Sequence, residues 1–159
     1  MKDLLRAIEG DPRITPERLG KLTGLSPEDA QAEIEKAESH GVILGYRTII
    51  DWDRTDEDLV QAWIELRVVP QQGTGFDAVA ERISRFEEAH SVFLLSGSYD
   101  VGLIVQARTM HDVSNFVAEK LATMEGVQST VTHFIMRRYK VQGVQTVSHD
   151  STERLAVSP

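Results

Sequence analysis

Cysteine is absent from this sequence. Its absence excludes disulfide bonds, zinc sites built on thiolates and catalysis by a thiol. Long apolar runs are also lacking, and Met1-Lys2-Asp3 leads directly into an amphipathic segment, so we expect no transmembrane span and no signal peptide. The expected location is therefore the cytoplasm, with no membrane partner.

Positive charge is scarce. Lys and Arg number 17 against 25 Asp and Glu, which gives a formal net charge of −8. This balance favours solubility and disfavours nonspecific binding to nucleic acid. What the chain does have is 159 residues with 41% hydrophobic content, which is enough for two small domains.

Residues 1–50 carry the pattern of three short helices. The first is predicted over about residues 2–9. Thr15-Pro16 has the character of an N-cap followed by a first helical residue, and Ser26-Pro27 repeats that signal after a turn at Gly24. Three such helices, the last two joined by a tight turn, predict a helix-turn-helix or winged-helix headpiece.

The last of these helices carries acid where a DNA-reading helix normally carries base. A phosphate backbone would be repelled by this face, so we expect DNA binding to be weak or to depend on several linked headpieces. An ordinary solvated helix face also explains the acids. The acids are Glu28, Asp29, Glu33, Glu35 and Glu38, set against Lys36 alone. The side chains that could contact DNA are Ser26, Gln31, Lys36 and Arg47, flanked by Arg13, Arg18 and Lys21.

Beyond the headpiece the pattern changes to alternating strands and helices. Residues 42–52 are predicted to form an extended strand that leaves the headpiece, and residues 51–58 a polar linker. Strand patterns follow at 61–69, 91–95, 101–107 and 127–139, with Pro70 closing the first, a loop at Gly73 and Gly75, and helices after Gly75 and Thr109. The order βαββαβ predicts a ferredoxin-like domain over residues 59–142 and an α+β chain. Residues 143–159 are expected to be a flexible tail, although Val144 and Thr146 could extend the sheet edge.

Two helices cover only one face of a four-stranded sheet. Trp63, Val101 and Phe134 are more apolar strand residues than one covered face readily absorbs. We therefore expect a homodimer with the sheets face to face, which larger assemblies could repeat.

Three segments are informative together: LSPEDAQAEIEKAESHGVILGYRTIID at 25–51, SGSYD at 96–100 and GVQSTVTHFIMRRYK at 126–140. In this order they resemble the Lrp/AsnC (feast/famine) family of transcriptional regulators. The resemblance covers about residues 1–140. It implies that the N-terminal domain binds operator DNA and that the C-terminal domain senses a small molecule, commonly an amino acid, between subunits. It also implies effector-binding roles for Gly97, Tyr99 and Asp100, with Thr130 and Thr132 as weaker candidates. We expect no enzymatic activity, no cofactor and no metal.

The chemistry of the Gly97–Asp100 turn agrees with such a ligand. A glycine at φ > 0 would expose N–H groups to a carboxylate, and Asp100 could pair with an ammonium group. A plain hairpin turn explains the same residues, because Gly and Asp are common in turns.

Two other functions remain open. Sequences with this two-domain plan also resemble siroheme decarboxylases, which rely on His and Arg residues. The five histidines here, including His133 just before Arg137 and Arg138, show no metal-ligand spacing. The other function is a ligand-sensing assembly module whose acidic headpiece pairs with a DNA-binding paralogue.

Overall fold

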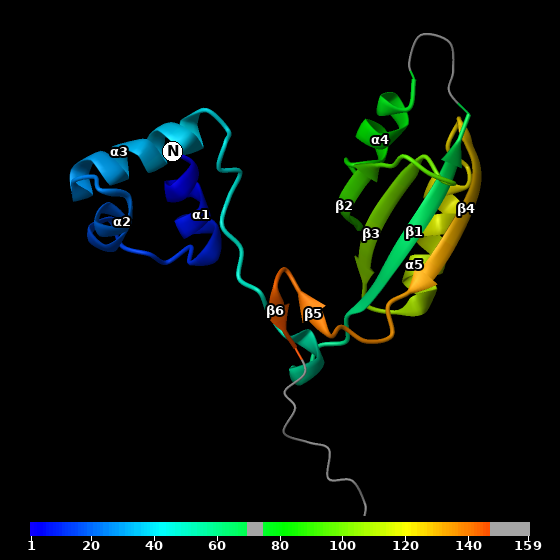
Figure 1. The fold of residues 1–159 in the computed structure, drawn as a ribbon. Coiled ribbons are helices and arrows are strands. Elements are labelled where there is room, and N and C mark those ends of the chain that lie inside the picture. Colours follow the sequence, from blue (N-terminus) through cyan, green and yellow to red (C-terminus); the bar gives the residue numbers. More distant parts are fainter. Residues whose placement is uncertain (70–74, 147–159) are drawn as a thin grey trace, which may run out of the picture. The chain divides into compact units, whose positions relative to one another are not determined.

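The computed structural model describes residues 1–69 and 75–146, and the chain divides into two compact units, Met1–Ile49 and Ile50–Pro159 (Figure 1). The predicted roles of Pro70 and Gly73 and the predicted tail after residue 146 lie outside the described residues. Each unit has a hydrophobic core of its own.

The first unit consists of three helices, α1 (Lys2–Gly10), α2 (Pro16–Thr23) and α3 (Pro27–Ser39). Both predicted caps are present: Thr15 accepts a hydrogen bond from the backbone N–H of Arg18, and Ser26 accepts one from that of Asp29. Gly24 ends α2 in the left-handed region at φ 74°. The core of the unit is formed by Leu4, Ile8, Leu19 and Ala30.

The turn from α2 to α3 depends on a close backbone approach at Gly20. A Cβ atom at this position would lie 2.6 Å from the carbonyl oxygen of Leu25. Because that oxygen belongs to the backbone, a side chain here would force the two helices apart. Glycine is therefore required by the space available.

The strand predicted over residues 42–52 is not formed. Residues 44–51 have no regular structure, and a single 3₁₀ turn, η1, follows at Trp52–Arg54. A strand needs a hydrogen-bonded neighbour, and the first unit contains only helices. The alternating apolar side chains that suggested a strand are instead exposed: Val42, Leu44, Tyr46, Ile49 and Ile50.

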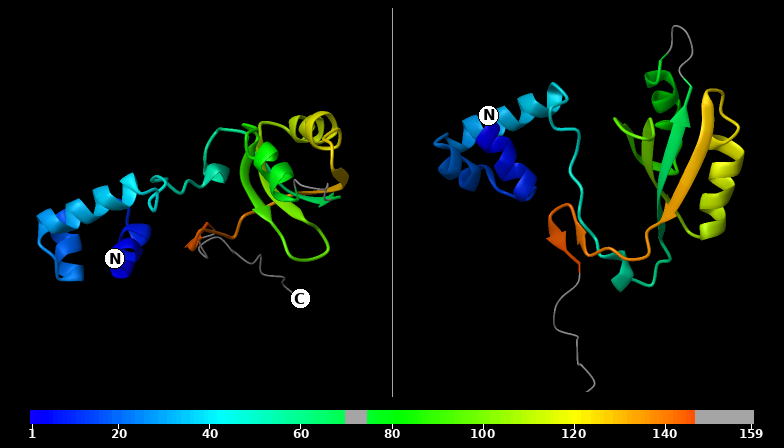
Figure 2. Two further views of the ribbon diagram at one scale, coloured as in Figure 1. Left: turned by 90° about the horizontal axis from the view of Figure 1, so that it is seen from above. Right: turned by 45° about the vertical axis from the view of Figure 1, so that its right-hand side comes forward.

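The second unit is a four-stranded antiparallel sheet with two helices on one face, a mixed α+β arrangement (Figure 2). The strands lie in the order β2-β3-β1-β4. The core packs between the sheet and the helices and includes Ile64, Leu66 and Leu103 from strands and Val113 and Phe116 from α5. The elements are β1 (Val60–Val68), α4 (Asp77–Ile83), β2 (Ala89–Leu94), β3 (Val101–Ala107), α5 (Met110–Phe116), the π-helical turn η2 (Val117–Leu121) and β4 (Val127–Phe134).

The last strand is shorter than predicted. β4 ends at Phe134 rather than at residue 139. Its antiparallel neighbour β1 begins at Val60, and the last hydrogen bond between these two segments runs from the Ile135 N–H to the Gln61 carbonyl. A separate hairpin of β5 (Lys140–Val141) and β6 (Val144–Gln145) follows. Val144 therefore pairs within this hairpin and not at the sheet edge.

The C-terminal hairpin is tied to the start of the second unit. Arg138 donates a hydrogen bond to the carboxylate of Asp53 in η1 over 2.7 Å, and the Arg138 side chain is only 14% exposed. The hydroxyl of Thr146 donates to the Arg138 carbonyl. The two ends of the described part of this unit therefore meet at one place.

The uncovered sheet face carries fewer of the expected apolar residues than predicted. Val101 and Phe134 are opposite Leu66 and Ala62, which places them on the helix-covered face. Trp63 does lie on the open face, where its ring covers Gly102 so closely that a Cβ would lie 2.4 Å away. Its neighbour on that face is Phe93, with ring centroids 6.1 Å apart.

Candidate functional site

The residues predicted to contact DNA lie on α2, α3 and the segments beside them. Arg13, Arg18 and Lys21, called the basic flank below, are exposed on the α1–α2 loop and on α2. Lys21 and Ser26 stand on either side of the α2–α3 turn. Gln31 and Lys36 are five residues apart and so lie about 140° apart around α3. The short turn therefore places Lys21 near Ser26, Arg13 lies beyond the other end of α2, and α3 separates Gln31 from Lys36.

Two of the acids of α3 have partners on the helix itself. Asp29 accepts a hydrogen bond from the hydroxyl of Ser26 over 2.8 Å, as part of the helix cap. Glu33 lies 3.8 Å from the ammonium group of Lys36. The only lysine of α3 is thus already paired, which leaves it less available to a phosphate.

Two further acids bind neutral side chains. Glu38 accepts a hydrogen bond from the hydroxyl of Tyr46 over 2.8 Å, which ties the extended segment to the end of α3. Desolvation raises the pKa of Tyr46 above its usual value, and the adjacent Glu38 carboxylate raises it further. Glu35 accepts a hydrogen bond from the amide nitrogen of Gln31 over 2.9 Å.

The turn predicted to bind an effector lies between β2 and β3, at one end of the sheet. Asp100 fixes it: the backbone N–H of Asp100 donates to the carbonyl of Leu66, and its carbonyl accepts from the N–H of Leu95. The Asp100 carboxylate accepts a hydrogen bond from the N–H of Val68 over 2.7 Å. The side chain thereby extends the β1–β3 ladder past its last backbone pair, so Asp100 has a structural role in this turn.

The conformation expected of Gly97 is not found. Gly97 is not among the glycines with positive φ, and a Cβ at this position would meet no atom within 4 Å. The turn closes through Asp100 instead, so its geometry does not require glycine at position 97. The surroundings of Gly97 are open space.

Sequence reasoning missed Arg67, which contacts this turn from β1. Its guanidinium donates a hydrogen bond to the carbonyl of Ser98 over 3.0 Å and lies 5.9 Å from the ring centroid of Tyr99. The signal available in the sequence was a cation near the end of a predicted strand. Arg67 and Ser98 are 31 positions apart in the sequence, so no local pattern predicts their contact.

Thr130 and Thr132 lie on β4, across β1 from the turn. They are opposite Leu66 and Ile64, so their side chains point to the helix-covered face. Neither hydroxyl has a hydrogen bond to the turn among the bonds found in the described residues. The structure therefore separates these threonines from Gly97, Tyr99 and Asp100.

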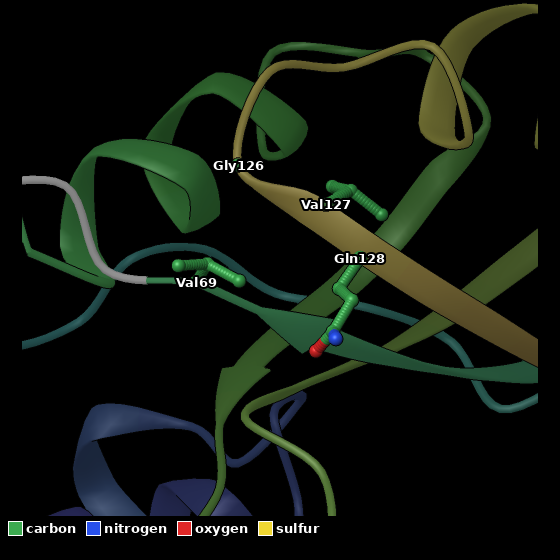
Figure 3. Close-up of a pocket in the computed structure, with 4 residues that line it drawn as sticks. All are labelled: Val69, Gly126, Val127 and Gln128. Atoms are coloured by element: carbon green, nitrogen blue, oxygen red, sulfur yellow. The ribbon is translucent and has the colours of Figure 1, made fainter.

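Two hollows open at the same end of the sheet. One, of about 300 Å³, is lined by Val69, Gly126, Val127 and Gln128, and in Figure 3 Val127 and Gln128 point to opposite sides of their strand. Val69 and Val127 are neighbours of the Val68–Asp100 contact through the chain and through β-pairing. A second hollow of about 160 Å³ shares Val69 and Gly126 with the first and is also lined by Gly75, Ala78, Val79, Arg82, Met124 and Glu125.

The described histidines include two that contact polar groups of other residues. His133 contacts Glu65 on the open sheet face, with 3.4 Å between nitrogen and oxygen, and His40 contacts the Lys36 carbonyl. Within residues 1–69 and 75–146 no three His, Asp or Glu side chains are grouped to hold a metal ion. His149 lies outside the described residues.

In the described segments, no helix has the length and apolar character needed to cross a membrane.

Known proteins share both the sequence and the fold. Residues 61–145 match the model of the Lrp/AsnC ligand binding domain. The HTH-type transcriptional regulator YugG of Bacillus subtilis is 39% identical over 158 residues, which cover 99% of this chain and 95% of YugG. The leucine-responsive regulatory protein of Haemophilus influenzae is 26% identical over 137 residues, which cover 86% of this chain and 82% of that protein.

Solved structures extend the likeness in fold. LrpA of Mycobacterium tuberculosis superposes with a TM-score of 0.73 at 20% identity, covering 92% of this chain and 97% of its own. The transcriptional regulator NMB0573 of Neisseria meningitidis, solved as an L-Met complex, has a TM-score of 0.69 at 22% identity and covers 87% and 89%.

A ligand-binding domain of this type, in a chain that matches a transcriptional regulator over nearly its whole length, defines the class as a transcriptional regulator. The chain belongs to the Lrp/AsnC family.

Proposed function

We propose that this protein is a cytoplasmic regulator that binds operator DNA through the helix-turn-helix headpiece of residues 1–50 and responds to an amino acid bound by the ferredoxin-like domain. The observation that carries the proposal is the match to YugG across 158 residues, because it spans both units. The short α2–α3 turn at Gly24 and the exposed basic flank support DNA binding by the first unit.

The end of the sheet around Asp100 supports binding of an amino acid. A zwitterionic ligand needs a cation for its carboxylate and an anion for its ammonium group. Arg67 and Asp100 both reach this turn, and the space around Gly97 is open. NMB0573 was solved with L-methionine, so L-methionine is the first ligand to test here.

The open sheet face supports a homodimer. Trp63 and Phe93 form an aromatic pair on this face, and Phe93 is 45% exposed in a single chain. A second copy placed face to face would remove both rings from water, and aromatic side chains at the centre of an interface commonly dominate its energy. We propose this face as the dimer interface, with the exposed apolar row of residues 42–50 as a second contact region.

A gel shift of the full chain on its own upstream DNA, at low and moderate salt, tests the regulator. Light scattering on the same sample counts the subunits. A specific, salt-sensitive shift by an oligomer is expected, because phosphate contacts release counterions. A folded oligomer that shifts no DNA at low salt would contradict DNA binding.

The acidic α3 favours a second candidate function. In it, the chain senses a ligand and joins a DNA-binding paralogue through charge complementarity with α3. Only one of the five acids, Glu33, is paired with a cation; the other bonded acids accept from neutral side chains and keep their charge for such a partner. We place this candidate second because the match to YugG, an HTH-type transcriptional regulator, spans both units.

A further inference from the structure

One side of α3 is turned away from the core of its unit. Ala30 and Ala37 are buried and Ile34 packs on the same side, at the spacing of one helix face. Since successive residues rotate by about 100°, the opposite side is defined by that spacing. The exposed residues Glu28, Ala32, Glu35, Lys36 and Ser39 lie within about 60° of the centre of that side, and Gln31 lies at its edge. Four of these six residues, Glu28, Gln31, Ala32 and Glu35, are called the outward row below.

The acids of α3 divide into those with a structural partner and those on the outward row. Asp29 takes part in the cap, Glu33 pairs with a lysine and Glu38 holds the extended segment. Glu28 has no hydrogen bond or ion pair among the residues that the structure describes, and Glu35 contacts Gln31. The row therefore presents carboxylates and an amide that the fold itself does not need.

These side chains match particular base edges of DNA. In the major groove a carboxylate accepts from the N4 amino group of cytosine, glutamine bonds N6 and N7 of adenine, and an alanine methyl contacts the methyl of thymine. Glutamine has two N–H donors and one acceptor. Gln31 donates one N–H to Glu35, so its second N–H and its oxygen remain available to an adenine.

We propose that the outward row of α3 contacts base edges in the major groove and selects cytosine, with the Glu35 carboxylate accepting from the cytosine amino group and Gln31 reading an adenine close by. This inference rests on the proposed DNA binding by the first unit. Residues 31 and 35 are about 6 Å apart along the helix axis. At about 3.4 Å per base, the adenine and the cytosine lie within about two base pairs of each other.

Phosphate contacts come from another part of the unit. Arg18 and Lys21 are three residues apart on α2 and so share a face, and Arg13 precedes that helix. In helix-turn-helix proteins the first helix of the motif crosses the backbone while the second enters the groove. Phosphate contacts position a protein, and base contacts specify the sequence. The basic flank therefore supplies affinity, and the acidic row supplies discrimination.

Selection of bound duplexes from a random pool by the full chain tests this assignment. The selected site is then compared with the same site in which one C·G pair is replaced, for the native chain and for Glu35→Ala. The native chain is expected to prefer the selected site by roughly 5- to 150-fold, the discrimination of a good base contact. Glu35→Ala is expected to remove most of that preference. Alanine favours helix, so the variant keeps α3.

Glu33→Ala is the matched control, because it removes the same charge from the same helix away from the outward row. It is expected to strengthen binding to both duplexes equally and to leave the preference unchanged. Glu35→Arg is expected to move the preference from cytosine to guanine, whose O6 and N7 accept from arginine.

The outcomes separate this inference from the proposed function. A selected site without a required cytosine, or an unchanged preference in Glu35→Ala, would overturn the readout by α3 while leaving DNA binding intact. Failure of the native chain to bind any duplex at low salt would overturn both.

Discussion

Replacing Asp100 by alanine and by asparagine separates its structural role from its proposed ligand role. In the native chain the Asp100 carboxylate accepts the N–H of Val68 over 2.7 Å in a partly buried position. Alanine leaves that N–H without its acceptor. Asparagine keeps an acceptor oxygen but removes the charge that would pair with a ligand ammonium group.

The two variants should differ in stability by amounts that can be measured. An unsatisfied buried donor costs about 1–3 kcal/mol, whereas exchanging a charged acceptor for a neutral one costs about 1 kcal/mol. For a unit of this size each kcal/mol lowers the melting temperature by about 4–8 °C. Asp100→Ala should therefore melt clearly below Asp100→Asn, with both below the native chain.

Asp100→Asn, the more stable of the two variants, should still lose affinity for the ligand. Calorimetry with L-methionine, or with whichever amino acid stabilises the native chain, should give a Kd about 10- to 150-fold weaker for Asp100→Asn, because a charge-assisted bond of about 1.5–3 kcal/mol is lost. Asp58→Asn is the control, since it removes one exposed carboxylate from the polar loop before β1. A folded Asp100→Asn that binds the amino acid as tightly as the native chain would refute the ligand role of Asp100.

Four further predictions follow from the packing and the charges. Gly20→Ala should destabilise the first unit by about 1–3 kcal/mol, measured by urea unfolding, and weaken DNA binding, because its Cβ meets the Leu25 carbonyl. Trp63→Ala should raise the dimer dissociation constant by at least about tenfold in light scattering, whereas an unchanged oligomer would contradict the proposed interface. The three cations of the basic flank limit the salt dependence of operator binding to a log–log slope of about −2.7 per headpiece, and a much steeper slope would show phosphate contacts elsewhere. Burial alone would raise the pKa of Glu88, but the hydrogen bonds from Lys120 and from its own backbone outweigh this and hold the pKa below its usual value. The stability from this contact is therefore present above the unfolded pKa of about 4.3 and is lost as the pH falls through the folded value. Lys120→Met should lower the free energy of unfolding near neutral pH and lower it less in acid.

Local signals predicted much of the fold. Thr15 and Ser26 cap the helices expected of them, and Thr109 forms a full capping box with Asp112. These contacts involve residues within a few positions of each other, so the sequence pattern contains the whole interaction. The alternation of buried residues in β1 is equally local.

The errors came from interactions between distant residues. Residues 42–52 have the pattern of a strand but lack a neighbour in the first unit, and β4 ends near the point where its antiparallel neighbour β1 begins. At the candidate site, the contact of Arg67 with the turn joins residues far apart in the chain. The motif predicts a ligand role for Asp100, which stays a prediction. Its bond to Val68 could not be predicted, because it depends on how β1 and β3 align.

The contact between Asp53 and Arg138 holds the two ends of the described part of the second unit close together. The chain enters this unit at η1 and, 85 residues later, the ion pair brings it back to the same point. Units whose ends lie close together tolerate insertion into other proteins and rearrangement of their chain order. Residues 50–146 thus have ends close enough together for the whole segment to be inserted into a single surface loop of another protein.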